Sequence, residues 1–174
     1  MRKNNLMITL CLILGLQCVM NAQKSEEMFT VYLVRHAEKA VSADNPKDPP
    51  LTECGEQRAA SLAVFLRDVE LDAIYSTDYK RTRSTAQPTA MDKKQELTIY
   101  NPRELEKFAE LLLEKKQDVL VVGHSNSTPT LAGLLVGEVL EPFDESIYNR
   151  IYQVVISKKN GRLEVFNSAF LCQD

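Results

Sequence analysis

Apolar residues along the chain fall into two kinds of segment, short compact runs and longer stretches with helical spacing, and the two kinds alternate. The compact runs are rich in β-branched and aromatic residues and predict strands. They occupy residues 29–34, 73–76, 97–100 and 119–122, and a last pair, 151–157 and 163–166, surrounds an Asn-Gly turn at 160–161. The stretches with helical spacing predict a helix that begins at Thr52 or Glu53 and others over 78–91, 102–116 and 129–136, the last with Ser127 or Thr128 as its N-cap. This alternation predicts an α/β fold with helices on both faces of a mixed or parallel sheet.

The first 22 residues have the layout of a secretory signal peptide. Arg2 and Lys3 precede an apolar run over residues 6–20, and Ala22 supplies a small residue at the expected cleavage point. The run is shorter than the roughly 20 residues that a transmembrane helix needs. We therefore expect a single domain over residues 23–174, secreted or periplasmic and without stable membrane insertion after cleavage. An uncleaved anchor and a lipid attached at Cys18 are the alternatives.

The composition excludes several classes of protein. The 174 residues are 44% hydrophobic and 26% charged with a formal net charge of −3, which is typical of globular domains and not of disordered or collagen-like chains. The mildly acidic balance argues against a nucleic-acid partner, because such a partner usually requires a basic surface. Two histidines are too few for a histidine-rich metal site, and no glycine-rich nucleotide motif occurs. We therefore expect no metal and no cofactor.

Two cysteines, Cys54 and Cys172, remain after the expected cleavage, in a chain sent to an oxidising compartment. A bridge between them would close a long loop and contribute about 4 kcal/mol to stability. Two unpaired thiols are the alternative, and the sequence leaves both open.

Both histidines directly follow predicted strands, where ligands bind in sheets of this kind. His36 follows residues 29–34, His124 follows residues 119–122, and Arg81 lies just beyond a third predicted strand. Guanidinium groups match the oxygens of a phosphate, and an imidazole can act as a nucleophile. The pattern therefore predicts a pocket for a dianionic phosphoryl group with His36 as the attacking group. The side chains expected around its oxygens are Arg35, Arg81 and His124.

The motifs around these residues resemble those of the histidine phosphatase superfamily, the phosphoglycerate mutase-like proteins. The matching runs are Arg35-His36-Ala37-Glu38 for the first histidine motif, Arg81 before Thr85-Ala86 for the second arginine motif, Gly123-His124-Ser125-Asn126 for the second histidine motif, and Leu51-Thr52-Glu53-Cys54-Gly55 for the L-T-x-x-G that opens the first helix. They occur in the family's order over nearly all of the chain after residue 22. The resemblance implies a phosphoglycerate mutase-like, three-layer α/β/α sandwich with a mostly parallel central sheet.

The resemblance also implies a phosphatase that hydrolyses a phosphate monoester or phosphoramidate through a covalent phosphohistidine on His36, without a cofactor. It implies phosphate binding by Arg35, Arg81 and His124, and a pocket-shaping role for Asn126. The small, minimal phosphatases of the family are the most similar type, and the substrate would be a phosphorylated small molecule or a phosphoprotein. Substrate specificity is expected from residues 40–50 and 141–149.

The general acid of the family has no clear counterpart in this sequence. Some relatives carry an Asp directly after the second histidine, where Ser125 stands here, and others carry a Glu on a long insertion that is absent. Glu38, Asp44 and Asp48 are candidates, although Glu38 fits better as a carboxylate that orients an arginine. Without an acid, we expect slow hydrolysis of alkyl phosphates or a substrate with a good leaving group, such as a phosphoramidate or acyl phosphate.

Other functions fit these residues less well. The run from Gly123 to Ser127 resembles the G-x-S-x-G elbow of an esterase, but no histidine follows Ser125 to complete a triad. No metal-hydrolase motif such as H-E-x-x-H occurs. A protein of the same fold that binds a phosphorylated ligand without turning it over remains the alternative.

Overall fold

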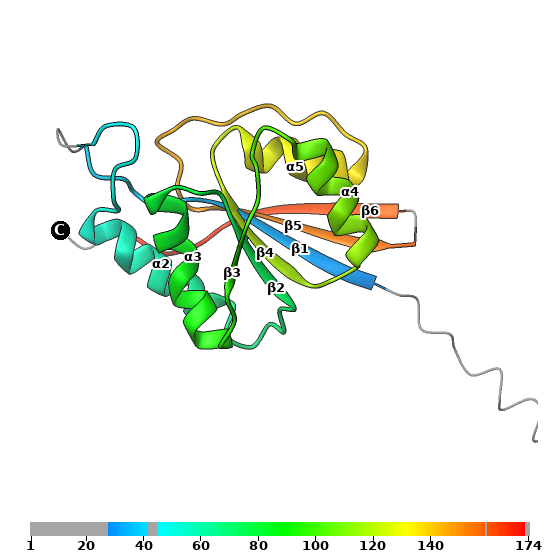
Figure 1. The fold of residues 1–174 in the computed structure, drawn as a ribbon, viewed down its shortest axis with the longest axis horizontal. Helices are drawn as coiled ribbons and strands as arrows, with labels where there is room; N and C mark the ends of the chain where they lie inside the picture. The colour runs from blue at the N-terminus through cyan, green and yellow to red at the C-terminus, as the bar shows by residue number, and fades with distance from the viewer. Residues whose placement is uncertain (1–27, 42–44, 159, 173–174) are drawn as a thin grey trace, which may run out of the picture.

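The computed structural model describes residues 28–41, 45–158 and 160–172 (Figure 1). The expected signal peptide and Asp44 lie outside these ranges. Within them, no helix has both the length and the apolar character that a membrane crossing requires.

Strands and helices alternate along the chain until two strands close it. In order they are β1 (Met28–Arg35), α2 (Glu53–Phe65), β2 (Ala73–Ser76), α3 (Lys80–Lys93), β3 (Leu97–Ile99), α4 (Leu105–Lys115), β4 (Val119–Gly123), α5 (Ser127–Val136), β5 (Arg150–Ser157) and β6 (Asn160–Asn167). The strands form one sheet in the order β3-β2-β4-β1-β5-β6. The first four pair in parallel, and β5 and β6 are antiparallel to their neighbours. The predicted three-layer sandwich with a mostly parallel sheet is therefore confirmed.

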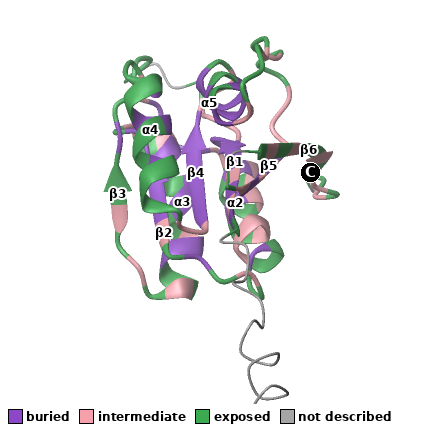
Figure 2. Cartoon of the chain, turned by 90° about the vertical axis from the view of Figure 1, so that its right-hand side faces the viewer, coloured by how far each residue is buried: buried purple, intermediate pink, exposed green. Residues whose placement is uncertain are grey.

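The core lies on both faces of this sheet, and the strands in its centre are buried throughout (Figure 2). Helices α2 and α3 pack together on one face, and α4 and α5 on the other (Figure 1). In β4, Val119 and Val121 belong to the cluster under α4 and α5, whereas Leu120 and Val122 belong to the cluster under α2 and α3. A strand that is covered on both sides reads as a continuous apolar run, which is what this segment shows in the sequence.

The register between β1 and β4 decides where the strand ends lie. The two strands run side by side in parallel, with Arg35 opposite Gly123. The backbone N–H of His36 donates to the carbonyl of Gly123 at 2.9 Å, which continues the pairing one residue past the end of β1. As a result, the residues that follow both strands emerge at the same edge of the sheet.

Three helices begin at different residues from those predicted, and the first of them, α3, begins at Lys80 and not at 78. Helix α4 begins at Leu105 and not at 102, because the N–H of Arg103 donates to the side chain of Asn101 at 3.1 Å and holds a turn there. Helix α5 begins at Ser127, and its N-cap position is Asn126 and not Ser127 or Thr128. Pro129 is tolerated in the first turn of α5 because the backbone N–H groups of the first helical turn have no partner within the helix.

The L-T-x-x-G run has two structural functions at the start of α2. Thr52 caps the helix, accepting a hydrogen bond from the N–H of Gly55 at 3.1 Å on its side chain. The N–H of Thr52 donates to the carbonyl of Glu38 at 2.9 Å, so the helix start is joined to the segment after His36. Gly55 lies so close to that same carbonyl that a Cβ atom at this position would overlap it.

A disulfide joins Cys54, in the first turn of α2, to Cys172 in the C-terminal tail. Their Cα atoms are 5.4 Å apart, within the usual range for such a bridge. Of the two alternatives left open by the sequence, the structure has the bridge.

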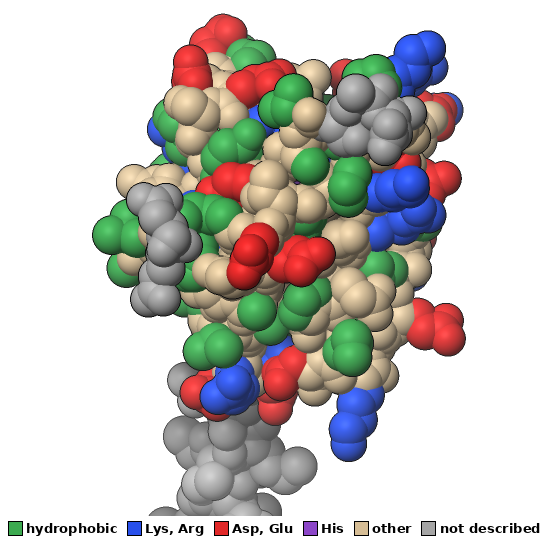
Figure 3. Space-filling view, turned by 90° about the vertical axis from the view of Figure 1, so that its left-hand side faces the viewer, with side chains coloured by type: hydrophobic (Ala, Val, Ile, Leu, Met, Phe, Trp, Pro, Cys, Tyr) green, Lys and Arg blue, Asp and Glu red, His purple; other side chains and the backbone are tan. Residues whose placement is uncertain are grey.

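On the face of the molecule drawn in Figure 3, acidic, basic and apolar side chains are interspersed, and neither sign of charge covers the whole face.

We predict that Gly55→Ala lowers the free energy of unfolding by about 1–3 kcal/mol, because the added methyl group has to displace backbone atoms. Urea denaturation of the two proteins measures the difference. Gln57→Ala is the matched control, since Gln57 is exposed on the same helix, and it should change stability by less than about 0.5 kcal/mol. Equal midpoints for Gly55→Ala and the wild type would contradict the prediction.

Candidate active site

The two histidines face one another at the shared edge of β1 and β4. Each is the first residue after its strand, and the strand register places the two side by side. Their ring centroids are 5.5 Å apart and the ring planes meet at 70°. The expectation that His36 and His124 come together is therefore met in the structure.

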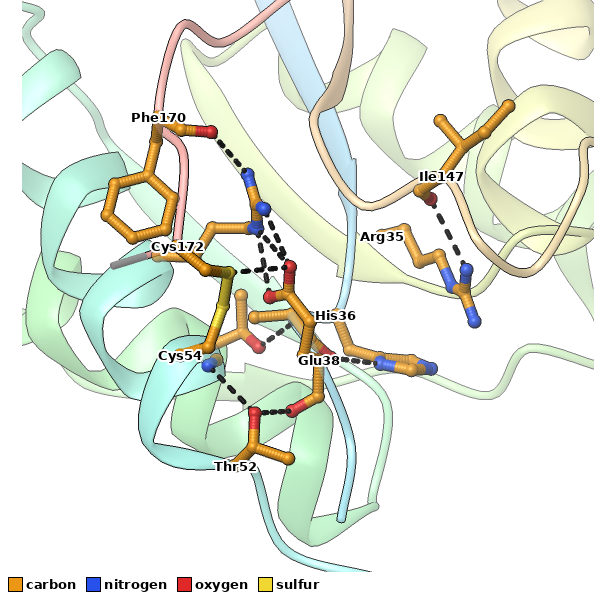
Figure 4. A network of polar contacts seen from close by, with 12 residues as sticks. Arg35, His36, Glu38, Thr52, Cys54, Ile147, Phe170 and Cys172 are labelled. Atoms are coloured by element: carbon orange, nitrogen blue, oxygen red, sulfur yellow. Dashed lines mark hydrogen bonds and ion pairs between the residues drawn. A yellow bond between two sulfur atoms is a disulfide. The ribbon is translucent and has the colours of Figure 1, made fainter. Parts of the chain in front are cut away.

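His36 is buried and its tautomer is set by one hydrogen bond. Nδ1 lies 2.8 Å from the carbonyl oxygen of Ala37 (Figure 4). Because a carbonyl can only accept, Nδ1 carries the hydrogen and Nε2 keeps its lone pair. Burial lowers the pKa of His36 to about 3, and the charges of Arg35, His124 and Arg81 lower it further, against the opposing effect of the Ala37 hydrogen bond. The ring is therefore neutral at pH 7.

His124 is held by a chain of buried hydroxyl groups. Its Nε2 lies 3.0 Å from Oγ1 of Thr77. The Thr82 hydroxyl donates to backbone carbonyls, so it can accept the Thr77 hydroxyl hydrogen at 2.9 Å. Thr77 then accepts from Nε2–H of His124, which leaves Nδ1 as the ring nitrogen available to a ligand. Burial lowers the pKa of His124 to about 4, followed by the charges of Arg81, Arg35 and Lys39.

Arg35 is a buried cation at the end of β1, with a side chain only 1% exposed. Its guanidinium lies 4.2 Å from the centre of the Tyr148 ring. It donates to the carbonyls of Glu145 and, at 3.3 Å, of Ile147 (Figure 4). Burial lowers the pKa of Arg35, and Tyr148 and Glu145 act in the opposite direction. An arginine remains charged under these conditions, so the strand end carries a fixed positive charge.

Arg81 approaches the same two rings from the first turn of α3. Its guanidinium lies 4.4 Å from the centre of the Tyr79 ring, and its Nη1 lies 3.8 Å from Oδ1 of Asp48. The Tyr79 ring also packs edge-on against His124, with centroids 5.2 Å apart. Among the described residues, the buried Nε atoms of Arg35 and Arg81 have no hydrogen-bond partner. These two unpaired donors point to an anion as the group that the cluster can bind.

These side chains line an open cleft of about 600 Å³. All five residues proposed for the site contribute to its wall, namely Arg35, His36, Arg81, His124 and Asn126. Asn126 is exposed, so it lies at the rim. Arg83 is not part of the wall, and its guanidinium pairs with Asp78 at 2.8 Å on the surface. The structure therefore places the two arginines of α3 in different surroundings, Arg81 in the wall of the cleft and Arg83 on the surface.

The two described candidates for a general acid, Glu38 and Asp48, are not part of the wall of the cleft. Glu38 does pair with an arginine, Arg58, and is absent from the wall of the cleft. Asp48 accepts from the N–H of Lys80 at 2.8 Å and lies beside Arg81, outside the wall. Asp44 lies outside the described residues. Neither described candidate faces the two histidines.

Sequence reasoning missed several residues of the site. Glu145 is the one carboxylate among the described residues that line the cleft, and Tyr148 covers Arg35. Both lie in the segment 141–149 that was expected to set specificity, but nothing in the sequence indicated which of its residues turn inward. Tyr79 stands two residues before Arg81, and that spacing was the available signal. Thr77 carries no signal in the sequence beyond its place after a strand.

No metal site emerges from the described part of the chain. The one group of three potential ligands found there is Glu38, Cys54 and Cys172. Because its two sulfur atoms are joined in the disulfide, they cannot bind a metal ion as thiolates.

Comparisons with known proteins give a family match over part of the chain and a likeness of fold over most of it. Residues 31–111 match the family model of the histidine phosphatase superfamily (branch 1). The probable phosphoglycerate mutase GpmB of Escherichia coli (strain K12 / DH10B) is 41% identical over 64 residues, which are 34% of this chain and 30% of that protein. The chain thus matches less than a third of the length of this curated relative.

Two solved structures resemble the whole domain. The protein histidine phosphatase SixA, complexed with tungstate, aligns with a TM-score of 0.67 at 18% identity, over 80% of this chain and 97% of that one. The alpha-ribazole phosphatase from Shigella flexneri aligns with a TM-score of 0.68 at 19% identity, over 84% of this chain and 100% of that one. At these identities the likeness concerns the fold. The segment that matches the histidine phosphatase superfamily contains Arg35, His36 and Arg81, so three of the residues that line the cleft lie in the part of the chain that resembles this family.

Proposed function

We propose that the chain is a phosphatase that transfers a phosphoryl group to Nε2 of His36 and then hydrolyses the phosphohistidine. The observation that carries the proposal is a pair of neutral imidazoles, 5.5 Å apart, in a cleft that also contains the buried guanidinium of Arg35 and the partly buried guanidinium of Arg81. A phosphatase is also what two structurally similar proteins, SixA and the alpha-ribazole phosphatase, are named.

Binding begins with the two arginines. Arg35 and Arg81 both line the cleft, the buried Nε of each has no partner, and a dianionic phosphoryl group can accept from both guanidinium groups. Nδ1 of neutral His124 carries a lone pair, so it can accept a hydrogen bond from a protonated phosphoryl oxygen or from the attacking water but does not donate one. In phosphoryl transfer the charge spreads over the three equatorial oxygens, so donors already in place stabilise the transition state more than the bound substrate. The solved SixA complex holds tungstate, an oxyanion, which fits a site of this kind.

In the chemical step, the lone pair of His36 Nε2 attacks phosphorus, and the bond from phosphorus to the leaving group breaks. The electron pair of that bond departs with the leaving group. Water then attacks the phosphohistidine, the P–N bond breaks, and inorganic phosphate and neutral His36 result. The low pKa of His36 favours this role, because the ring holds no proton at Nε2 that would have to be removed first.

The arrangement of Glu145 bears on the choice of substrate. This carboxylate is 71% exposed and pairs with Lys39 at 3.3 Å and with Arg35 at 3.8 Å. Both ion pairs engage its oxygens, so we propose that Glu145 orients the two cations and does not protonate the leaving group. The leaving group must then depart without a strong acid, which favours phosphoramidates, acyl phosphates and aryl phosphates over alkyl phosphates.

Two features support a location outside the cytoplasm. Residues 1–22 have the layout of a signal peptide. The disulfide between Cys54 and Cys172 is of the kind that persists in oxidising compartments. We therefore propose that the domain acts as a secreted or periplasmic enzyme.

We predict that His36→Ala abolishes turnover of p-nitrophenyl phosphate, because the mutant has no attacking nitrogen. Arg81→Ala should lower kcat/KM by about 10³-fold, since an arginine that holds the transferred phosphoryl group can contribute this much. Arg83→Ala is the matched control on the same helix and should retain activity within about twofold. Turnover by His36→Ala at the wild-type rate would exclude the phosphohistidine. If the wild type binds phosphate without turnover, the alternative of a phospho-ligand binding protein is correct.

The two histidines should stay neutral far below the pH at which an exposed imidazole gains a proton. In the folded protein without a tag, ¹⁵N NMR should show both rings uncharged at pH 5, with His124 titrating near 4 and His36 near 3. In urea the same rings should titrate near about 6.5. His124→Asn identifies the signal of His36. A midpoint near 6.5 in the folded state would show that the rings are not buried among cations as described.

The rate should depend steeply on the leaving group. We expect kcat/KM for aryl phosphates to rise as the pKa of the phenol falls, and alkyl phosphates to react at least about 10²-fold more slowly than p-nitrophenyl phosphate, because no acid assists their departure. Steady-state kinetics on a series of substituted phenyl phosphates measures this dependence. A flat dependence would reveal a proton donor in the cleft.

A further inference from the structure

A polar network lies behind His36, on the side of the loop away from the cleft, and the reaction described above makes no use of it. Glu38, which is labelled in Figure 4, forms its centre together with Arg58. Nε of Arg58 donates to both carboxylate oxygens of Glu38, at 3.0 and 2.9 Å, and Nη2 donates to Oε1 at 2.6 Å. The side chains of Arg58 and Glu38 are 14% and 18% exposed. This is a forked pair that is largely shielded from water.

The C-terminal tail is what shields it. After β6, the chain crosses to α2, and the carbonyl of Phe170 accepts from Nη1 of Arg58 at 3.4 Å. The Phe170 ring lies 4.9 Å from the same guanidinium, and Sγ of Cys172 lies 3.7 Å from Oε1 of Glu38. Leu171 between them is exposed. A tail that buries so little apolar surface tends to fray, so we attribute its position largely to the disulfide with Cys54.

Glu38 is connected to His36 through a single peptide unit. The carbonyl of Ala37, which accepts from Nδ1 of His36, belongs to the planar peptide bond between Ala37 and Glu38. The orientation of that carbonyl therefore follows the position of Glu38. Glu38 is held at its own carbonyl by the N–H of Thr52 and at its side chain by Arg58. Loss of the second attachment leaves the acceptor for His36 less well defined.

We propose that Glu38 and Arg58 are positioning residues for His36, and that the Cys54–Cys172 disulfide maintains them by fastening the tail over the pair, so that phosphoryl transfer depends on this disulfide. The inference rests on the proposed function where it is tested by the rate of turnover. Its test by the NMR signal of His36 does not depend on that function. A dithiol reduces the disulfide by supplying two electrons and two protons, which gives two thiols and the oxidised dithiol. The freed tail exposes the pair to water, where ion pairs are weak.

The first experiment compares the oxidised full chain with the chain reduced by dithiothreitol and with Cys172→Ala, on p-nitrophenyl phosphate. We expect kcat to fall about tenfold in both, because displacement of a reacting group lowers the rate. KM should change less than twofold, because Arg35 and Arg81 are attached to β1 and α3 and not to the tail. Circular dichroism confirms that each protein is folded. An unchanged kcat in the folded, reduced protein overturns the proposal.

A second experiment tests whether the tail acts through Arg58 and leaves the disulfide intact. Arg58→Ala should lower kcat about tenfold, and Arg58→Lys should recover part of the loss because it keeps the charge without the fork. Reduction of Arg58→Ala should cause no further loss, since two changes in one chain of contacts are not additive. Arg162→Ala is the matched control, because it removes an exposed ion pair with Glu164 outside the cleft. Independent, additive losses on reduction and in Arg58→Ala overturn the proposal.

The ¹⁵N signal of His36 Nδ1 supplies a readout that does not depend on turnover. Reduction and Arg58→Ala should each shift or broaden this signal, whereas Arg162→Ala should leave it in place. If the oxidised wild type turns over no phosphate ester, the phosphatase proposal fails, and this spectrum alone decides the positioning proposal. If reduction unfolds the protein, Arg58→Ala with its disulfide intact decides it. An unchanged signal in folded Arg58→Ala overturns the inference.

Discussion

The parallel pairing of β1 with β4 is the constraint on which the site depends. With Arg35 opposite Gly123 and the N–H of His36 bonded to the Gly123 carbonyl, the residues that follow both strands have to leave the sheet together. A one-residue slip would turn every side chain of one strand to the other face. It would also break the alternation that sends the side chains of β4 into two separate cores. The packing of the sheet and the meeting of the two imidazoles are therefore consequences of one register.

Burial then gives these imidazoles their chemical character. The pKa of His36 is lowered to about 3 and that of His124 to about 4, first by burial and then by the nearby cations. Between about pH 3 and the unfolded value of about 6.5, the unfolded chain binds more protons than the folded one, so stability declines as the pH falls through this range. The cations themselves are offset by the Tyr148 and Tyr79 rings and by backbone carbonyls. The site thus lowers the free energy of unfolding of the domain, because it keeps two rings neutral and holds two guanidinium groups in place.

The segment after His36 is held from outside the sheet by three attachments of different kinds. The capping Thr52 binds the carbonyl of Glu38, Gly55 allows the start of α2 to approach it, and Arg58 binds its carboxylate. Thr52 and Gly55 are close to Glu38 in the chain. The tail that covers the pair of Glu38 and Arg58 is more than a hundred residues away, and a disulfide across 118 positions joins it to α2. The immediate surroundings of the proposed nucleophile therefore include both ends of the domain.

The sequence by itself determined the alternation of strands and helices, a mixed or parallel sheet, and the side chains expected at its edge. These were readable because hydrophobic periodicity and the position of a residue directly after a strand are local features. The roles of Glu145, Tyr148 and Thr77, the partner of Glu38, and the pairing of Cys54 with Cys172 were decided only by the tertiary structure. Each depends on a contact between segments far apart in the chain, or on which side of a loop turns inward, and such contacts follow from packing in three dimensions and leave no periodic pattern in the sequence.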